Sequence, residues 1–331
     1  MNNNVSPSKS KNIGTLIGDF SLKNKALIIL LILCILASFV TPAFLTTRNL
    51  MNVVRQISAS AILGIGFTLV IASANLDLSV GYMLGMLGVI MGLLSRANVP
   101  FPLVLLGGIA CGALCGFLNG YIGVKFKLPL FIVTLATGQV YRGLCQLFSN
   151  TSPVNGLQSQ FKVLGQGYLG PIPIPIYIMF FVMLIIYIIL NKTRFGRHAI
   201  ATGGNSEAAR TSGVNTGFVT IRVYIIMGIC ASIAAMVMTG RAFSAQPTAG
   251  QGMEMDAIAA VVIGGTSLYG GSGNIIGTVI GCLIVGVINN ILNLNAVDSN
   301  WQLVAKGLLI LSAVLLDVVS TRYFNKKMNK V

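Results

Sequence analysis

Few residues of this chain have the chemistry of a catalytic or metal site. There is a single histidine, His198, and none of the six cysteines is spaced as Cys-x-x-Cys. The ligand clusters of structural metal sites are therefore missing from the sequence. The glycine-rich stretch at residues 264–273 has no lysine, and no Gly-x-x-x-x-Gly-Lys-Ser/Thr segment occurs elsewhere, so no ATP-binding phosphate loop is expected. The sequence predicts no catalytic site, no metal and no cofactor, and hence no enzyme.

Several polar side chains instead lie within or beside long apolar runs, where polar groups are costly and often functional. Asp77 lies between two runs, and it either caps the following helix or faces a transport pathway. Arg142 either extends its head group to the membrane surface or donates hydrogen bonds into a polar passage. Asparagines in such runs bind neighbouring helices by default, and contact with a neutral polyhydroxy solute is the functional alternative. The candidates for a translocation pathway are Asn75, Asp77, Asn119, Gln139, Arg142, Asn289 and Asn290.

The composition excludes a water-soluble protein. Of 331 residues, 55% are hydrophobic and only 9% are charged, whereas about 25% are charged in soluble domains. The mean hydropathy is +0.85. A net charge of +15 would suggest a nucleic-acid partner in a soluble protein, but the basic residues here fall mainly in short gaps between apolar runs. That distribution orients a protein in lipid, and no nucleic-acid partner is expected.

Ten apolar runs are candidates for membrane-spanning helices, and they predict an all-α integral membrane protein. They are residues 26–45, 57–74, 79–94, 101–124, 128–148, 174–190, 218–240, 257–271, 275–294 and 302–319. Several are close to the roughly 20 residues that cross about 30 Å of hydrocarbon. The runs at 79–94 and 257–271 are short and glycine-rich, which favours tilted, broken or re-entrant helices covered by protein or by a water-filled cavity.

The distribution of basic residues predicts that both termini are cytoplasmic. If all ten runs cross, most Lys and Arg residues outside the runs fall on the cytoplasmic side. The other side holds Arg48, Arg55, Arg96, Lys162 and Arg241. The predicted organisation is a cytoplasmic N-terminal tail (residues 1–25), a transmembrane domain (26–320) with a large cytoplasmic loop (191–217), and a cytoplasmic C-terminal tail (321–331).

Glycines recur every three or four residues in three of the apolar runs. The clearest series is Gly108, Gly112, Gly116 and Gly120, and similar series begin at Gly81 and at Gly273. In lipid, stripes of small residues let helix backbones approach closely. The series therefore predict close helix packing within the chain, with a subunit interface or a pore lining as the alternative.

The large predicted loop contains a sequence suited to a short capped helix. It reads Asn205, Ser206, Glu207, Ala208, Ala209 and Arg210. Asn205 or Ser206 can accept a hydrogen bond from the first free amides, and Gly213 can end the helix in a left-handed conformation. Such a helix gives a soluble partner a surface to bind, and a merely solvated loop is the alternative.

Glu207-Ala208-Ala209 followed by Gly213 resembles the Glu-Ala-Ala-x-x-x-Gly coupling motif of permease subunits in ATP-binding-cassette importers. Further segments resemble the monosaccharide permeases among them, in particular those for ribose. These segments are residues 75–81, 128–135, 203–205, 244–250, 256–271 and 289–290. They cover most of the chain between about residue 45 and residue 320, and their order and spacing are more specific than any one of them.

The resemblance implies a pathway formed by two permease subunits, here a homodimer, which separate ATPase subunits drive and an extracytoplasmic sugar-binding protein supplies. Residues 205–213 would contact the ATPase, and residues 46–52 and 246–253 would lie toward the binding protein. The chain departs from the family at Ala74-Asn75-Leu76-Asp77, where Gly-Ile-Asp or Gly-Glu-Ile-Asp is usual. It also has Pro129-Leu130-Phe131 in place of Pro-Pro-Phe. These departures leave the exact sugar open.

The expected function is import of a ribose-like monosaccharide across the bacterial inner membrane. One strong acid and one strong base near the interior suit a neutral solute better than an ion or an amino acid. Another pentose or hexose, or a sugar-like signalling molecule, is the alternative substrate. A secondary transporter driven by H⁺ or Na⁺, with Asp77 as its ion site, is the alternative mechanism, and a membrane scaffold is a third possibility.

Overall fold

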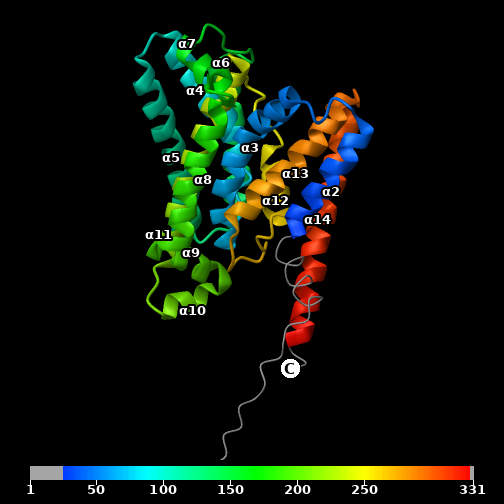
Figure 1. The fold of residues 1–331 in the computed structure, drawn as a ribbon. Coiled ribbons are helices and arrows are strands. Elements are labelled where there is room, and N and C mark those ends of the chain that lie inside the picture. Colours follow the sequence, from blue (N-terminus) through cyan, green and yellow to red (C-terminus); the bar gives the residue numbers. More distant parts are fainter. Residues whose placement is uncertain (1–24, 329–331) are drawn as a thin grey trace, which may run out of the picture.

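The computed structural model describes residues 25–328, which form a mostly helical bundle with one short hairpin (Figure 1). The helices are α2 (Lys25–Val40), α3 (Thr47–Ala72), α4 (Val80–Arg96), α5 (Phe101–Phe126), α6 (Leu130–Ser149), α7 (Ser159–Gln166), α8 (Ile174–Lys192), α9 (Arg194–Gly204), α10 (Ser206–Thr211), α11 (Thr216–Ala242), α12 (Met253–Ile263), α13 (Ile275–Leu294) and α14 (Ser299–Met328). The antiparallel strands β1 (Tyr168–Leu169) and β2 (Ile172–Pro173) make the hairpin. Helices α9 and α10 lie at the lower end of the bundle in Figure 1, called the α10 end, and α7 lies at the opposite, α7 end.

Five helices are long and apolar enough to cross a membrane, namely α3, α5, α8, α11 and α13. Helices α2 and α4 are shorter and apolar, and the 17 residues of α4 are about 26 Å long. The structure thus agrees with an all-α membrane protein. Five of the ten predicted runs correspond to these five helices. Of the predicted tails, residues 1–24 and 329–331 lie outside the described residues.

The run predicted at residues 257–271 is not one helix. Helix α12 begins earlier, at Met253, and ends at Ile263; Gly264 and Gly265 follow, and Gly265 has a φ of +89°. The 11 residues of α12 cover about 16 Å, roughly half of the hydrocarbon thickness. The chain reaches α12 through irregular backbone at residues 243–252. The sequence predicts a tilted, broken or re-entrant helix here, and in the structure the helix ends at Ile263, within the predicted run.

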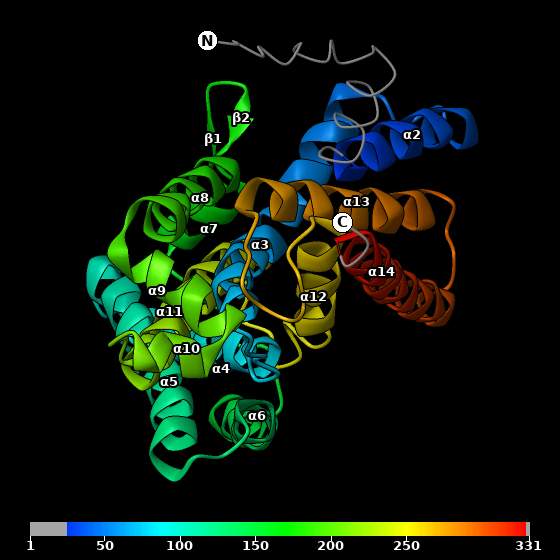
Figure 2. The ribbon, with the colours of Figure 1, turned by 90° about the horizontal axis from the view of Figure 1, so that it is seen from below.

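The centre of the bundle is built around α3 and α11. Helix α11 packs most extensively against α5 and also against α3 and α4. Every residue of α3 between Ala61 and Ala72 is buried, as expected of a helix surrounded by protein rather than by lipid. Seen from the α10 end, α6 lies at one edge of the molecule and α14 at another (Figure 2).

The glycine series pack within the chain, as predicted. On α5, a side chain at Gly112 would meet the carbonyl oxygen of Gly228 on α11, and a side chain at Gly116 would meet that of Tyr224. On α13, Gly281 lies against the carbonyl oxygen of Ala260 in α12. These positions allow backbone-to-backbone contact, which any larger residue would prevent.

Candidate functional site

The irregular backbone at residues 243–252 runs beside α4 rather than over the surface of the bundle. Ala245 lies at Gly92, Ala249 at Gly85 and Gly250 at Gly81, so the segment follows α4 for about 16 Å. A bridge of two 2.9 Å hydrogen bonds joins Ala245 to Val154, in the loop that precedes α7. The glycine series of α4 therefore makes room for a non-helical chain segment. At membrane depth such backbone is tolerated where it is covered by protein or lines a water-filled cavity.

Asp77 lies in a fully buried hydrogen-bond network near the N-terminus of α4. Its Oδ1 accepts hydrogen bonds from the backbone N–H (3.0 Å) and the hydroxyl (2.6 Å) of Ser79. Asn119 of α5 donates to the Ser79 hydroxyl at 2.9 Å, and Tyr141 of α6 donates to the Asn119 carbonyl oxygen at 3.0 Å. The second carboxylate oxygen, Oδ2, has no hydrogen-bond partner among the described residues. Asp77 and Asn119 thus belong to a buried network that joins the start of α4 to α5 and α6.

Substituting Asp77 separates the structural and transport roles that the sequence left open. Asp77→Asn is expected to retain the melting temperature, because the amide oxygen can still accept from Ser79 and no unpaired charge is buried. Asp77→Ala is expected to lose about 2 kcal/mol of stability, since two buried donors lose their acceptor. Thermal unfolding in detergent measures both variants. Wild-type melting and wild-type solute uptake in both would exclude any role for this carboxylate.

The other candidates near Asp77 lie in different surroundings. Asn75 is half-buried and donates back to the backbone carbonyl of Ser73 at 2.9 Å, so it stabilises the turn after α3. Gln139 and Arg142 are exposed on α6, and the Arg142 guanidinium lies 5.7 Å from the ring centre of Tyr82. Within the described part of the chain these two side chains are uncovered, and the large exposed side chains around them are apolar, among them Leu135 and Val140; Figure 2 shows α6 at the edge of the bundle.

The two asparagines of α13 are used differently. Asn290 and Asn49 of α3 exchange two hydrogen bonds, each of 3.0 Å, through their side-chain amides. This is the interhelical bonding that was expected by default. Asn289 instead has a buried carbonyl oxygen without a partner within residues 25–328. It lines a small cavity of about 40 Å³ together with Gln56 and Asp256, large enough for a water molecule.

An ion pair joins α12 to α14, and no pattern in the sequence indicated it. Lys306 Nζ lies 2.8 Å from Asp256 Oδ2, with side chains that are 30% and 14% exposed. Lys306 belongs to a predicted apolar run and Asp256 directly precedes another, so the pair neutralises two charges that would each be costly in lipid. It fixes α14 against the half-length helix α12.

Breaking this pair is expected to destabilise the protein through the charge left behind. Lys306→Met should cost about 2 kcal/mol, less than the 3–5 kcal/mol of a fully buried pair because both side chains are partly exposed. The double variant Asp256→Asn/Lys306→Met should recover most of the loss. Melting temperatures in detergent test this, and equal losses in the single and double variants would show that the pair itself is unimportant.

The predicted helix of the large loop is present as α10, at the α10 end of the bundle (Figure 1). The Asn205 side chain accepts from the Ala208 N–H at 2.9 Å, and Gly213 has a φ of +85°. The N–H of Val214 reaches the Ala209 carbonyl at 3.0 Å, which completes a Schellman C-cap.

The outer surface of α10 is available to a partner. Ala209 is buried, while Glu207, Ala208 and Arg210 are exposed. The exposed Glu207–Arg210 ion pair of 2.8 Å contributes little to stability.

Helix α9 connects α10 rigidly to the centre of the bundle. A side chain at Gly203 would collide with the carbonyl oxygen of Ala72, at the end of α3. The same carbonyl accepts a 3.0 Å hydrogen bond from the N–H of Gly271, in the loop after α12. Thus α9, the turn leading to Asp77 and the loop after α12 meet at one point.

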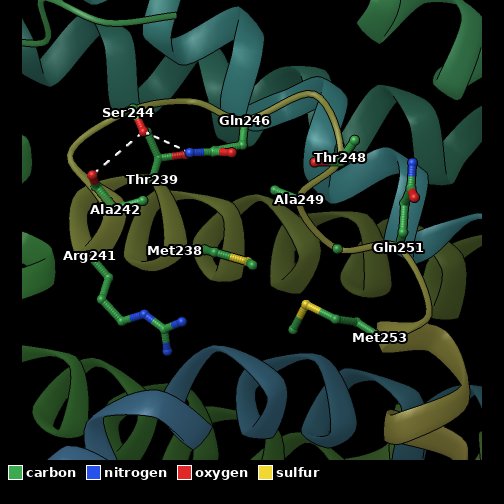
Figure 3. A pocket seen from close by; sticks show the side chains of 11 residues that line it. Met238, Thr239, Arg241, Ala242, Ser244, Gln246, Thr248, Ala249, Gln251 and Met253 are labelled. Carbon is green, nitrogen blue, oxygen red and sulfur yellow. Dashed lines mark hydrogen bonds between the residues drawn. The ribbon is translucent and has the colours of Figure 1, made fainter. Parts of the chain in front are cut away.

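A cavity of about 360 Å³ opens beside residues 243–252 (Figure 3). The last turns of α11 and the segment itself line it, with Thr239, Arg241, Gln246, Thr248 and Gln251 as polar side chains. Arg241 donates to the backbone carbonyl of Gln56 at 3.3 Å. From the sequence, residues 246–253 are predicted only to face another protein, and Arg241 is predicted only to lie on the extracytoplasmic side.

The chain is a helical bundle with apolar spans, an internal non-helical segment and a polar cavity, and its sequence predicts no catalytic cluster. Together these features define a multi-pass membrane transport protein. The sequence family described as "Branched-chain amino acid transport system / permease component" matches residues 49–314. The chain belongs to this family of transport-system permeases and is a multi-pass inner-membrane protein.

Curated relatives align with nearly the whole chain. The ribose import permease protein of Bacillus subtilis is 43% identical over 87% of this chain and 90% of its own length. The ribose import permease protein of Haemophilus influenzae is 41% identical over 91% and 94%. The D-allose transport system permease protein of Escherichia coli is 38% identical over 88% and 89%. No solved structure matches the chain.

Proposed function

We propose that this chain forms the translocation pathway of an ATP-driven importer for a ribose-like monosaccharide. The relatives named for ribose and allose support a sugar rather than an amino acid as the solute. The sparse charge within the spans favours the same conclusion, since an amino acid needs partners for two opposite charges. Another pentose or hexose is the alternative substrate.

The observation that carries the proposal is the α9–α10 arm. An exposed, capped helix projects from one end of the bundle, and Gly203 ties it to α3 and to the loop after α12. A separate ATPase that moves α10 would therefore move the end of α3, which leads into the turn with Asp77, and the loop that follows α12. Coupling of this kind needs a stiff connection between partner and pathway. We assign the contact with the ATPase to Asn205, Glu207, Ala208, Ala209, Arg210 and Gly213. Because the ATPase is cytoplasmic, this contact also assigns the α10 end and both termini to the cytoplasm.

Two further partners follow from the same arrangement. The α7 end would face an extracytoplasmic sugar-binding protein, with residues 46–52 on that side and residues 246–253 leading inward from it along α4. Gln139 and Arg142, which are exposed on the otherwise mostly apolar outer face of α6, would be costly against lipid. A second copy of this chain covering that face would give a permease homodimer with a shared pathway.

Reconstitution with the ATPase and binding protein that copurify with the chain tests the proposal. ATP on the α10 side of the membrane should drive uptake of d-ribose, and an uncoupler should leave the uptake unchanged. A secondary transporter using Asp77 would behave in the opposite way: its uptake would collapse with the uncoupler and need no ATPase. Uptake without ATP would overturn the proposed mechanism.

A further inference from the structure

The cavity of about 360 Å³ beside residues 243–252 has the size of a binding site for a small solute. Pockets for small molecules typically enclose about 300–1,000 Å³. In Figure 3, Met238 from α11 and Met253 from the start of α12 reach into the space from opposite sides, and Gln246 and Thr248 lie on the segment that borders it. The lining therefore combines flexible apolar surface with amides and hydroxyls.

The polar groups of the lining have hydrogen-bonding capacity to spare. Gln246 and Thr248 are exposed, while the intervening Pro247 is buried, so the segment turns alternate side chains toward the cavity and toward the protein. Gln246 donates weakly to the Ser244 hydroxyl at 3.3 Å, which leaves its carbonyl oxygen available. Within residues 25–328, neither Thr248 nor Gln251 has a side-chain hydrogen bond. These groups can both donate and accept.

Arg241 adds a cationic donor without adding an ion pair. One of its N–H groups bonds to the Gln56 carbonyl, and no ion pair connects it to a carboxylate in the described part of the chain. The lining includes no Asp or Glu. A cation is therefore disfavoured, whereas hydroxyl groups can accept from Arg241 and exchange hydrogen bonds with the amides.

We propose that this cavity binds a neutral monosaccharide during its passage, with Gln246, Thr248, Gln251 and Arg241 contacting its hydroxyls and the two methionines packing on its C–H surface. The proposal rests on the proposed function for the direction of transport and names residues that the sequence did not place on the pathway. It also explains the non-helical backbone, because a segment that lines a polar cavity can expose unpaired peptide groups at membrane depth.

Protection from a thiol reagent tests the site directly, without any partner protein. Thr248→Cys in the full chain, reconstituted in nanodiscs, is labelled with a membrane-impermeant methanethiosulfonate, and the unsubstituted chain gives the background from the native cysteines. d-Ribose at ten times its dissociation constant should slow labelling about tenfold, because bound ligand excludes the reagent. The matched control is Gln160→Cys on α7, an exposed position at which ribose should change nothing.

Uptake by the complete importer supplies the second measurement. Gln246→Ala and Gln251→Ala should each lower the maximal uptake rate about threefold to tenfold, the loss expected for a hydrogen bond. The half-saturating sugar concentration should stay unchanged if the binding protein sets it, and Leu184→Ala, at an exposed position in the middle of α8, should be neutral.

The outcomes separate the two proposals. Normal uptake in both glutamine variants, together with labelling of Thr248→Cys that ribose does not slow, overturns the cavity site and leaves the importer intact. If ribose slows the labelling of Thr248→Cys but the complete importer does not transport ribose, the proposed substrate is wrong and the cavity remains a binding site. Stronger protection by ribose 5-phosphate than by ribose overturns the neutral class and assigns the Arg241 charge to an anionic solute.

Discussion

ATP-driven uptake is expected to fall about tenfold or more in Ala208→Trp and in Gly213→Val, with the folded bundle intact. Ala208 is exposed on α10, so the indole would occupy the surface that we assign to the ATPase. Gly213 has a φ of +85°, a conformation that costs a β-branched residue roughly 1–2 kcal/mol. That penalty favours other geometries of the turn and displaces α10, and a tenfold loss corresponds to about 1.4 kcal/mol of coupling. Stimulation of ATPase activity by sugar-loaded binding protein, together with uptake in reconstituted vesicles, measures the effect.

The controls distinguish coupling from folding. No neighbour lies within 4 Å of a side chain built at Gly213, so both variants should reach the membrane and melt near the wild-type temperature. Phe181→Trp, at an exposed position in the middle of α8 and away from both partner-facing ends, should retain uptake and stimulation. If both measurements stay normal in Ala208→Trp and Gly213→Val, α10 is not the coupling element.

Gly228→Val is expected to have the largest effect on stability, because it separates the two helices that pack most extensively. A Cβ at Gly228 would overlap the carbonyl oxygen of Gly112 on α5. Backbone atoms cannot rotate aside as a side chain does, so α5 and α11 must move apart along their contact. Overpacking of this kind costs about 3 kcal/mol. Thermal unfolding of the purified chain in detergent, with the monodisperse fraction on gel filtration, gives the result.

Gly143→Ala is the matched control for this substitution. Gly143 also lies in a helix, α6, but a side chain there would have no neighbour within 4 Å. Alanine should leave the melting temperature unchanged or raise it, since it favours helix by up to about 1 kcal/mol over glycine. Similar melting of Gly228→Val and Gly143→Ala would contradict close α5–α11 packing.

Features that depend on neighbouring residues could be predicted from the sequence. The capped helix α10 is an example, because Asn205 bonds to an amide three residues away and Gly213 adopts its own favoured left-handed conformation. The membrane class follows in the same way, since composition and run length need no tertiary information. The glycine series also indicated correctly that backbones would meet, but not which backbones.

The roles of the polar residues inside the spans depended on the tertiary structure. Asn119 and Gln139 are both amides within predicted runs, yet Asn119 is bonded to Ser79 and Tyr141 while Gln139 is exposed. Helical periodicity shows which residues share a face, but not which other helix that face meets.

By itself, the sequence thus determined an all-helical membrane protein, the resemblance to importer permeases and the short helix of its large loop. Tertiary structure alone decided that Asp256 pairs with Lys306, 50 residues away, and that Asn49 pairs with Asn290, 241 residues away. It also decided that residues 243–252 run beside the glycines of α4 and open a polar cavity. The physical reason is that local patterns govern how each helix forms, whereas contacts between distant residues determine which polar groups are covered and which remain available to a solute.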